Sequence, residues 1–142
     1  MKITDLQVND WVRIIEPDPH HGYIAKVRCI GGTNNYLTVY MPHQHNKDVF
    51  IEDVEPIELT ADILRSNDFE NDNDNYVLWY NDGTDSVEVE LKDKNYTNGS
   101  YTFVNVNRGC VSIFELPVQY VHELQHVLKM CEIDVDINPM ED

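Results

Sequence analysis

The chain has 142 residues, of which 42% are hydrophobic, enough for the core of one ordinary domain or of two very small ones. It carries 26 acidic and 10 basic side chains, a formal net charge of −16. Nucleic acids and anionic lipids bind proteins mainly through Lys and Arg, so this charge argues against direct contact with either. It is compatible with simple solubility or with a basic protein partner.

No apolar run approaches the roughly 20 residues that a membrane-spanning helix needs. The first residues have no apolar stretch of the kind found in secretory signals, so we expect an unsecreted protein. Cys29, Cys110 and Cys131 lie far apart with no C-x-x-C spacing, which is typical of reduced thiols in a cytosolic compartment. We therefore expect a cytoplasmic location.

Residues 1–59 alternate short runs rich in Val, Ile and Tyr with turn-forming clusters. Runs of this length, with turns every few residues, predict a small antiparallel β-structure. Because the segment is short, we expect an SH3-like barrel rather than an OB-fold. The five predicted strands are 11–15, 23–30, 36–41, 49–51 and 54–57.

Residues 60–142 predict an α-β-β-β-β-α unit with an antiparallel sheet. Thr60 is a suitable N-cap for a first helix, which we expect to stop at Asn67-Asp68, followed by an acidic loop to Asn75. A second helix is predicted from Pro117 to about Glu132, since proline is favoured at the first helical position. The four predicted strands are 76–80, 86–91, 101–106 and 111–114.

Residues 122–126 read H-E-L-Q-H, which matches the H-E-x-x-H pattern of zinc metalloproteases. In those enzymes two histidines one helical turn apart bind zinc, and the glutamate acts as general base. Here His122 and His126 would be the ligands and Glu123 the base. The match is short and two of its five positions are free, so its surroundings must decide its meaning.

Those surroundings argue against a zinc site. On a helical wheel of roughly 100° per residue, His122 and His126 fall almost opposite the apolar side, so we expect both rings to face water. The apolar side is formed by Tyr120, Leu124, Val127, Leu128 and Cys131, with Val121 at its border. We interpret the motif as coincidental on an amphipathic helix. An adventitious surface metal site and a small zinc hydrolase are the alternatives.

A third zinc ligand is also missing from the sequence pattern. The extended metzincin motif places a glycine and then a histidine after the pair, but here these positions hold Lys129 and Glu132. Asp134 and Asp136 fall in a predicted extended tail and are poor substitutes. We therefore expect no catalytic residue, no cofactor and no metal.

The other candidate metal ligands give equally weak evidence for a metal site. His20, His21, His43 and His45 lie in predicted loops without an accompanying cysteine, whereas structural zinc sites usually include thiolates. The alternating acidic residues of the loop lack the glycine and the final glutamate of an EF-hand. Those acidic residues are Asp68, Glu70, Asp72 and Asp74.

Several aromatic residues lie on predicted strands. We expect them to pack in the core or at sheet edges, with a peptide-binding platform as the alternative. They are Trp11, Tyr36, Tyr40, Trp79 and Tyr80.

Three phrases, D-L-Q-V-N-D-W-V (5–12), I-E-D-V-E-P-I-E-L-T (51–60) and Y-V-H-E-L-Q-H (120–126), occur together. In combination and order they resemble a group of short uncharacterised proteins of Bacteroidota genomes, prophages and phages. The resemblance covers most of the chain. It implies a mobile-element context and transfers no catalytic residue, because the group has no established activity.

We therefore expect a non-enzymatic protein-interaction module of phage or prophage type, either a virion component or a host-interaction protein. The alternative among binding proteins is an acidic inhibitor that occupies the nucleic-acid-binding groove of a host protein. The alternative among enzymes is the zinc hydrolase described above.

Overall fold

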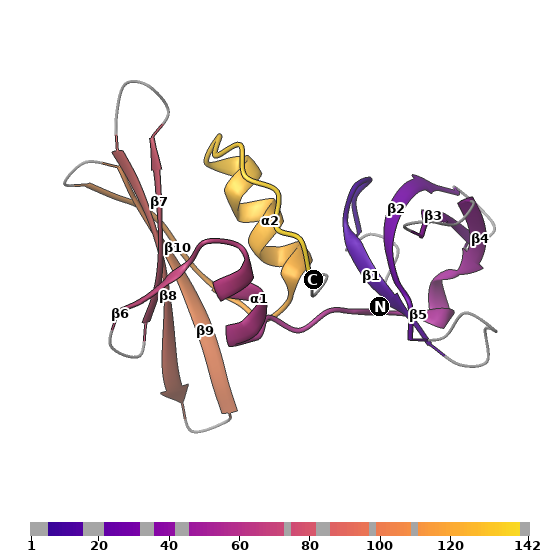
Figure 1. Cartoon of the computed structure of the whole chain (residues 1–142), viewed down its shortest axis with the longest axis horizontal. Helices are drawn as coiled ribbons and strands as arrows, with labels where there is room; N and C mark the ends of the chain where they lie inside the picture. Colours follow the sequence, from indigo (N-terminus) through magenta and orange to yellow (C-terminus); the bar gives the residue numbers. More distant parts are fainter. Residues whose placement is uncertain are drawn as a thin grey trace. The chain divides into compact units, whose positions relative to one another are not determined.

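The computed structural model describes most of the chain and divides it into two compact units, Met1–Ile57 and Glu58–Asp142 (Figure 1). We describe each unit by itself. The described residues are 6–15, 22–31, 36–41, 46–72, 75–81, 86–96, 99–108 and 111–139, without the side chains of 72, 92–103 and 111–116.

The N-terminal unit is a five-stranded antiparallel sheet with the order β4-β3-β2-β1-β5. A short 3-10 helix, η2 (Ile51–Asp53), connects the two edge strands. No pairing among the described strands joins β4 to β5, so the described pairing forms an open sheet and the predicted SH3-like barrel is not confirmed. The strands are β1 (Trp11–Ile14), β2 (Ile24–Ile30), β3 (Tyr36–Tyr40), β4 (Asn46–Phe50) and β5 (Val54–Pro56).

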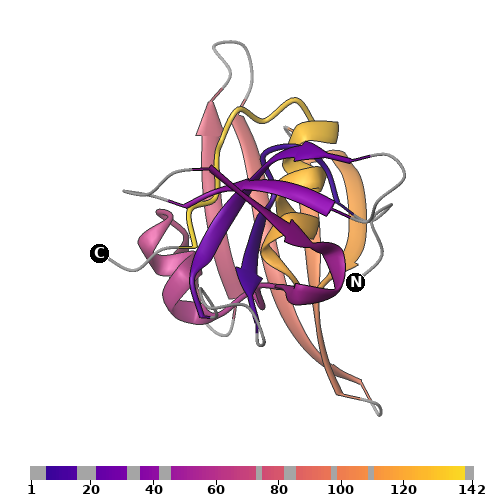
Figure 2. The ribbon, with the colours of Figure 1, turned by 90° about the vertical axis from the view of Figure 1, so that its right-hand side faces the viewer.

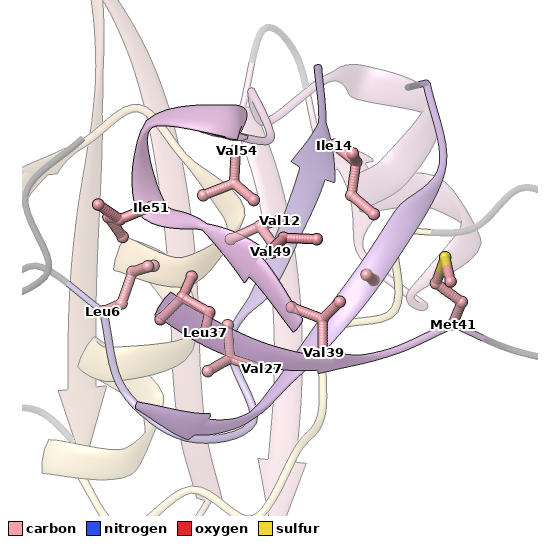
Figure 3. Close-up of a cluster of buried hydrophobic side chains, with 11 residues drawn as sticks. Leu6, Val12, Ile14, Val27, Leu37, Val39, Met41, Val49, Ile51 and Val54 are labelled. Carbon is pink, nitrogen blue, oxygen red and sulfur yellow. The ribbon is translucent and has the colours of Figure 1, made fainter. Parts of the chain in front are cut away.

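Strand alternation builds the core of this unit. Successive side chains of a strand point to opposite faces, so in β1 Val12 and Ile14 are buried while Trp11 and Arg13 are only partly covered. Figure 3 shows side chains from all five strands pointing toward one another. The buried cluster is Leu6, Val12, Ile14, Ala25, Val27, Leu37, Val39, Met41, Val49, Ile51 and Val54.

A β-bulge interrupts the pairing of β2 with β3 between Val27 and Cys29. A bulge places an extra residue in one strand, so the alternation of its side chains shifts. Arg28 and Cys29 are consequently both exposed, whereas Val27 is fully buried.

A tight turn, Gln7–Asp10, leads into β1. The Asp10 N–H donates to the Gln7 carbonyl (3.1 Å), and the Gln7 N–H donates to the Asp10 carboxylate (2.7 Å). Asn9 has φ of 78°, a left-handed conformation that asparagine tolerates better than most residues. Asp10 is only 2% exposed, so its side chain is buried within this turn.

The C-terminal unit is an α+β structure with a second antiparallel sheet, as predicted. The strand order is β10-β9-β8-β7-β6, and β8 and β9 extend beyond their neighbours as a long hairpin (Figure 2). The elements are α1 (Ala61–Ser66), β6 (Glu70–Asp72), β7 (Asn75–Asn81), β8 (Ser86–Tyr96), β9 (Gly99–Arg108), β10 (Val111–Val118) and α2 (Val121–Met130).

Several boundaries differ from the prediction, and the last three strands are longer than expected. Part of the expected acidic loop forms β6, which pairs with β7 through Glu70 and Val77. Pro117 lies in β10 and not at the start of a helix, and α2 begins at Val121. A proline is tolerated there because β10 is an edge strand, whose outer side needs no N–H donor.

The first helix forms as predicted. The Thr60 side chain accepts a hydrogen bond from the Ile63 N–H (3.2 Å), which caps α1, and Asp62 stands in the first turn. The chain leaves the helix at Asn67, and Asp68 then adopts a φ of 69°.

Both helices lie on the same side of the C-terminal sheet (Figure 1). On β8 the residues facing the helices, Val87, Val89 and Leu91, are buried, while Glu88 and Glu90 point to the other side and are partly exposed. No described element of this unit covers that second side. The sheet thus has one core-forming face and one open polar face.

Residues 133–139 run on beyond α2 and are held by two side-chain amides. Gln125 donates to the Val135 carbonyl (2.8 Å) and accepts from the Ile137 N–H (2.7 Å). Asn67 makes the same reciprocal pair with the backbone of Asn138, at 2.8 Å in each direction. Ile137 is fully buried, so this segment, predicted as a polar tail, contributes to the core. No helix in the described part of the chain is long and apolar enough to cross a membrane.

The Gln7–Asp10 turn generates the first prediction. Replacing Asp10 by Ala removes a buried acceptor and leaves the Gln7 N–H without it, so we expect a loss of about 1–3 kcal/mol in the free energy of unfolding. Asp10→Asn keeps an acceptor oxygen and should cost clearly less. Urea unfolding followed by circular dichroism measures both, and equal midpoints for the two variants would contradict this role.

Candidate functional site

The helix α2 carries the H-E-x-x-H residues, and its start is fixed by the strand-like segment before it. The Leu59 N–H donates to the Gln119 carbonyl (3.0 Å), and Glu58 forms an isolated antiparallel bridge with Tyr120. Tyr120 is the N-cap in an extended conformation, so the helix begins directly after this bridge.

Glu123 closes the N-terminus of this helix. One carboxylate oxygen, Oε1, accepts hydrogen bonds from the backbone N–H groups of Gln119 and Tyr120, both at 3.0 Å. These contacts resemble the glutamate half of a capping box, and a carboxylate in the first turn also suits the positive end of the helix dipole. The glutamate that the zinc-hydrolase hypothesis needs as general base is therefore engaged as a helix cap.

The prediction that both histidine rings face water is wrong for His122. His122 is only 6% exposed, and its ring stacks on that of Tyr120 with centroids 5.9 Å apart. The His126 ring is partly buried and meets the His122 ring edge-on at 5.5 Å. The helical wheel assumed a single covered side, but the segment held by Gln125 covers a further side of α2.

The two imidazoles are therefore neighbours, but within the described part of the chain no third metal-ligating side chain is grouped with them. Among the residues that the structure describes, no group of three or more His, Cys, Asp or Glu side chains is arranged to hold a metal ion. Glu132 leaves the helix with φ of 59°, and Asp134 and Asp136 are exposed.

The other candidate metal ligands can be placed only in part. His20, His21, His43 and His45 lie outside the described residues, as do Asp74 and the side chain of Asp72. Asp68 and Glu70 are exposed.

The described thiols are both free. Cys29 is exposed on β2, and Cys131 is partly buried at the C-cap of α2. Burial raises the pKa of the Cys131 thiol, and the nearby Arg108 guanidinium opposes that rise. Cys110 lies outside the described residues.

A more promising surface lies on the N-terminal sheet, where two aromatic rings pack together in the open. Tyr36 on β3 and Phe50 on β4 are direct partners in the strand register, and their ring centroids are 4.3 Å apart. They are 39% and 41% exposed. We call these two residues the aromatic pair. Its Phe50 lies on β4, which is an edge strand of the sheet, and its Tyr36 lies on the neighbouring β3.

Only one residue of the aromatic pair was singled out from the sequence. Tyr36 was expected to pack in the core or at an edge, and Phe50 was not singled out. The usable signal was alternation, because Val49 is buried and its neighbour Phe50 must then point outward. Trp79 is likewise an exception to the expected packing, since it is 62% exposed on the open face of the C-terminal sheet.

No protein-family model and no curated protein matches the chain. Its function is therefore inferred from the surfaces described above.

The position of Glu123 generates the second prediction. Glu123→Ala removes the cap and should lower the free energy of unfolding by about 1 kcal/mol. Glu123→Gln retains an acceptor oxygen and should unfold close to the parent protein. Thermal or urea unfolding distinguishes the two variants. Equal stability of Glu123→Ala and the parent would contradict the capping role.

Proposed function

We propose that the protein is a non-enzymatic protein-interaction module of phage or prophage type, acting in the bacterial cytoplasm or as part of a virion. Its N-terminal unit is proposed to be SH3-like. The strand order β4-β3-β2-β1-β5 and the 3-10 helix η2 between β4 and β5 support that assignment.

The observation that carries the proposal is the aromatic pair beside an edge strand. Exposed aromatic side chains grouped on a surface commonly mark binding sites, because burying them on a partner removes apolar area from water. An edge strand can also pair with an extended peptide, whose backbone bonds give affinity while pockets or platforms select side chains. Tyr36 and Phe50 would provide such a platform at β4.

A protein partner is also favoured by charge. The net charge of −16 repels nucleic acid and anionic membrane surfaces, whereas backbone pairing and ring contacts are insensitive to it. Binding through the aromatic pair should therefore persist at moderate salt.

The third prediction tests this surface. Tyr36→Ser/Phe50→Ser should reduce the amount of specifically retained partner about tenfold or more when the immobilised protein captures proteins from infected host cells. Met130→Ser is the matched control, since Met130 is 60% exposed and lies on α2 of the C-terminal unit. Identical captured proteins for all three forms would refute the proposal.

A second candidate function, an acidic inhibitor of a nucleic-acid-binding protein, is favoured by the open face of the C-terminal sheet. Glu88 and Glu90 point outward from β8, and Trp79 stands directly opposite Glu88 in the register. Carboxylates around an exposed indole are suited to Lys and Arg side chains through ion pairs and cation–π contacts.

The fourth prediction separates the two candidates. An inhibitor of this kind would release its captured partner as salt rises through several hundred millimolar and would compete with added duplex DNA. A partner that resists both treatments but is lost from Tyr36→Ser/Phe50→Ser supports the aromatic-pair proposal instead.

A further inference from the structure

The outward face of β2 places two cations at the centre of the N-terminal sheet. Lys26 Nζ lies 5.4 Å from the centre of the Trp11 ring, and Arg28 Cζ lies 4.8 Å from the centre of the Tyr40 ring. Both cations are thus held in place by neighbouring aromatic rings on β1 and β3. We call these four residues the cationic face.

The cationic face is exceptional in so acidic a chain. Among the described residues, neither Lys26 nor Arg28 forms an ion pair, and Arg28 is exposed. Asp48, an exposed acidic residue on β4, accepts a hydrogen bond from Thr38 (2.7 Å). The face therefore offers two positive charges to an anionic partner.

The open face of the C-terminal sheet offers the complementary arrangement. Glu88 and Glu90 point outward from β8, which is the central strand of its sheet, as β2 is of the other. Glu90 Oε1 also accepts a hydrogen bond from the Asn75 side chain (3.2 Å). Trp79 stands opposite Glu88 and is 62% exposed. We call Trp79, Glu88 and Glu90 the acidic face.

The charges on the two faces have a similar spacing in the sequence. Lys26 and Arg28 are two residues apart on β2, where Arg28 lies at the β-bulge. Glu88 and Glu90 are two residues apart on β8, about 6.6 Å along an extended strand. Each pair has a tryptophan on a neighbouring strand. Two sheets that pack face to face lie about 10 Å apart, a gap that Lys and Arg side chains can bridge to glutamates.

We propose that the cationic face of one copy of this chain binds the acidic face of another copy. Such a contact is heterologous, since two different surfaces meet. An open assembly keeps one unused cationic face at one end and one unused acidic face at the other, so it grows head to tail or closes into a ring. The inference uses residues other than Tyr36 and Phe50 and does not depend on the function proposed above.

Nucleic acid is the less favoured occupant of the cationic face. Proteins that bind single strands offer free ring faces on which bases stack. Here Lys26 and Arg28 already lie over Trp11 and Tyr40. Carboxylates of a protein surface need only the cations.

The association should be weak, because exposed ion pairs contribute little each and the two copies repel each other through their net charge. Sedimentation equilibrium from about 10 µM to about 1 mM covers the corresponding range. We expect the weight-average mass of the parent protein to rise with concentration.

Two neutralised variants give the decisive test. Lys26→Gln/Arg28→Gln removes the cationic face, and Glu88→Gln/Glu90→Gln removes the acidic face. Each variant alone should remain monomeric. An equimolar mixture should form a complex that stops at two chains, because only one intact face of each kind remains. Formation of this two-chain complex would also show that both variants are folded.

Arg65→Gln/Lys129→Gln is the charge-matched control, since both side chains are exposed on helices of the C-terminal unit, and it should associate like the parent. Three outcomes would overturn the proposal. These are a parent that sediments as a monomer throughout, double variants that associate as the parent does, and a mixture that fails to form a complex of two chains.

A further arm tests the other occupants. Fluorescence anisotropy with a labelled single-stranded DNA of about 20 nucleotides reports binding of nucleic acid, within the usual site size of such proteins. DNA binding by the parent that is lost in Lys26→Gln/Arg28→Gln would assign the cationic face to nucleic acid and overturn the proposal. If the parent is a monomer and either double variant is a monomer with a larger hydrodynamic radius, the cationic and acidic faces bind each other within one chain. That result would also overturn the proposal.

Discussion

The pleat of two central strands, β2 and β8, is the constraint on which both units depend. In β2, Ala25 and Val27 point into the core while Lys26 and Arg28 point out, and β8 repeats this pattern with buried valines and outward Glu88. A shift of one residue in either register would bury charges and expose the core. The same alternation that builds each core therefore also selects the side chains of each outer surface.

Within the H-E-x-x-H residues, the glutamate takes part in helix capping. A glutamate at the third helical position and an extended residue before the helix are favoured at many helix starts. Glu123 fulfils that role by accepting the N–H groups of Gln119 and Tyr120. His122 and His126 lie one turn apart and contact each other, yet the described residues bring no third donor to them.

The fold class and most strands could be predicted because they follow from local patterns, namely alternation, turn residues and the Thr60 cap. The predictions that failed concern residues whose environment depends on contacts with other parts of the fold. Pro117 is accommodated by an edge strand that only pairing reveals. His122 is buried although the wheel of its own helix places it opposite the apolar side. The Tyr36–Phe50 contact joins strands whose register the sequence does not state. For residues 1–59 the described pairing shows a five-stranded antiparallel sheet, and the SH3-like barrel expected there stays a prediction.

Because the side-chain amides of Asn67 and Gln125 bind residues near position 138, the two units can complete their folds at different stages of synthesis. The described strands of the first unit end by Pro56, so its core can assemble while later residues are still being added. The second unit must wait for Ile137 and Asn138, whose backbone groups complete the pairs with Gln125 and Asn67. Until those residues leave the ribosome, the segment that packs beside the helices of that unit is missing. Apolar surface of the helices is then exposed, and a chaperone could bind it.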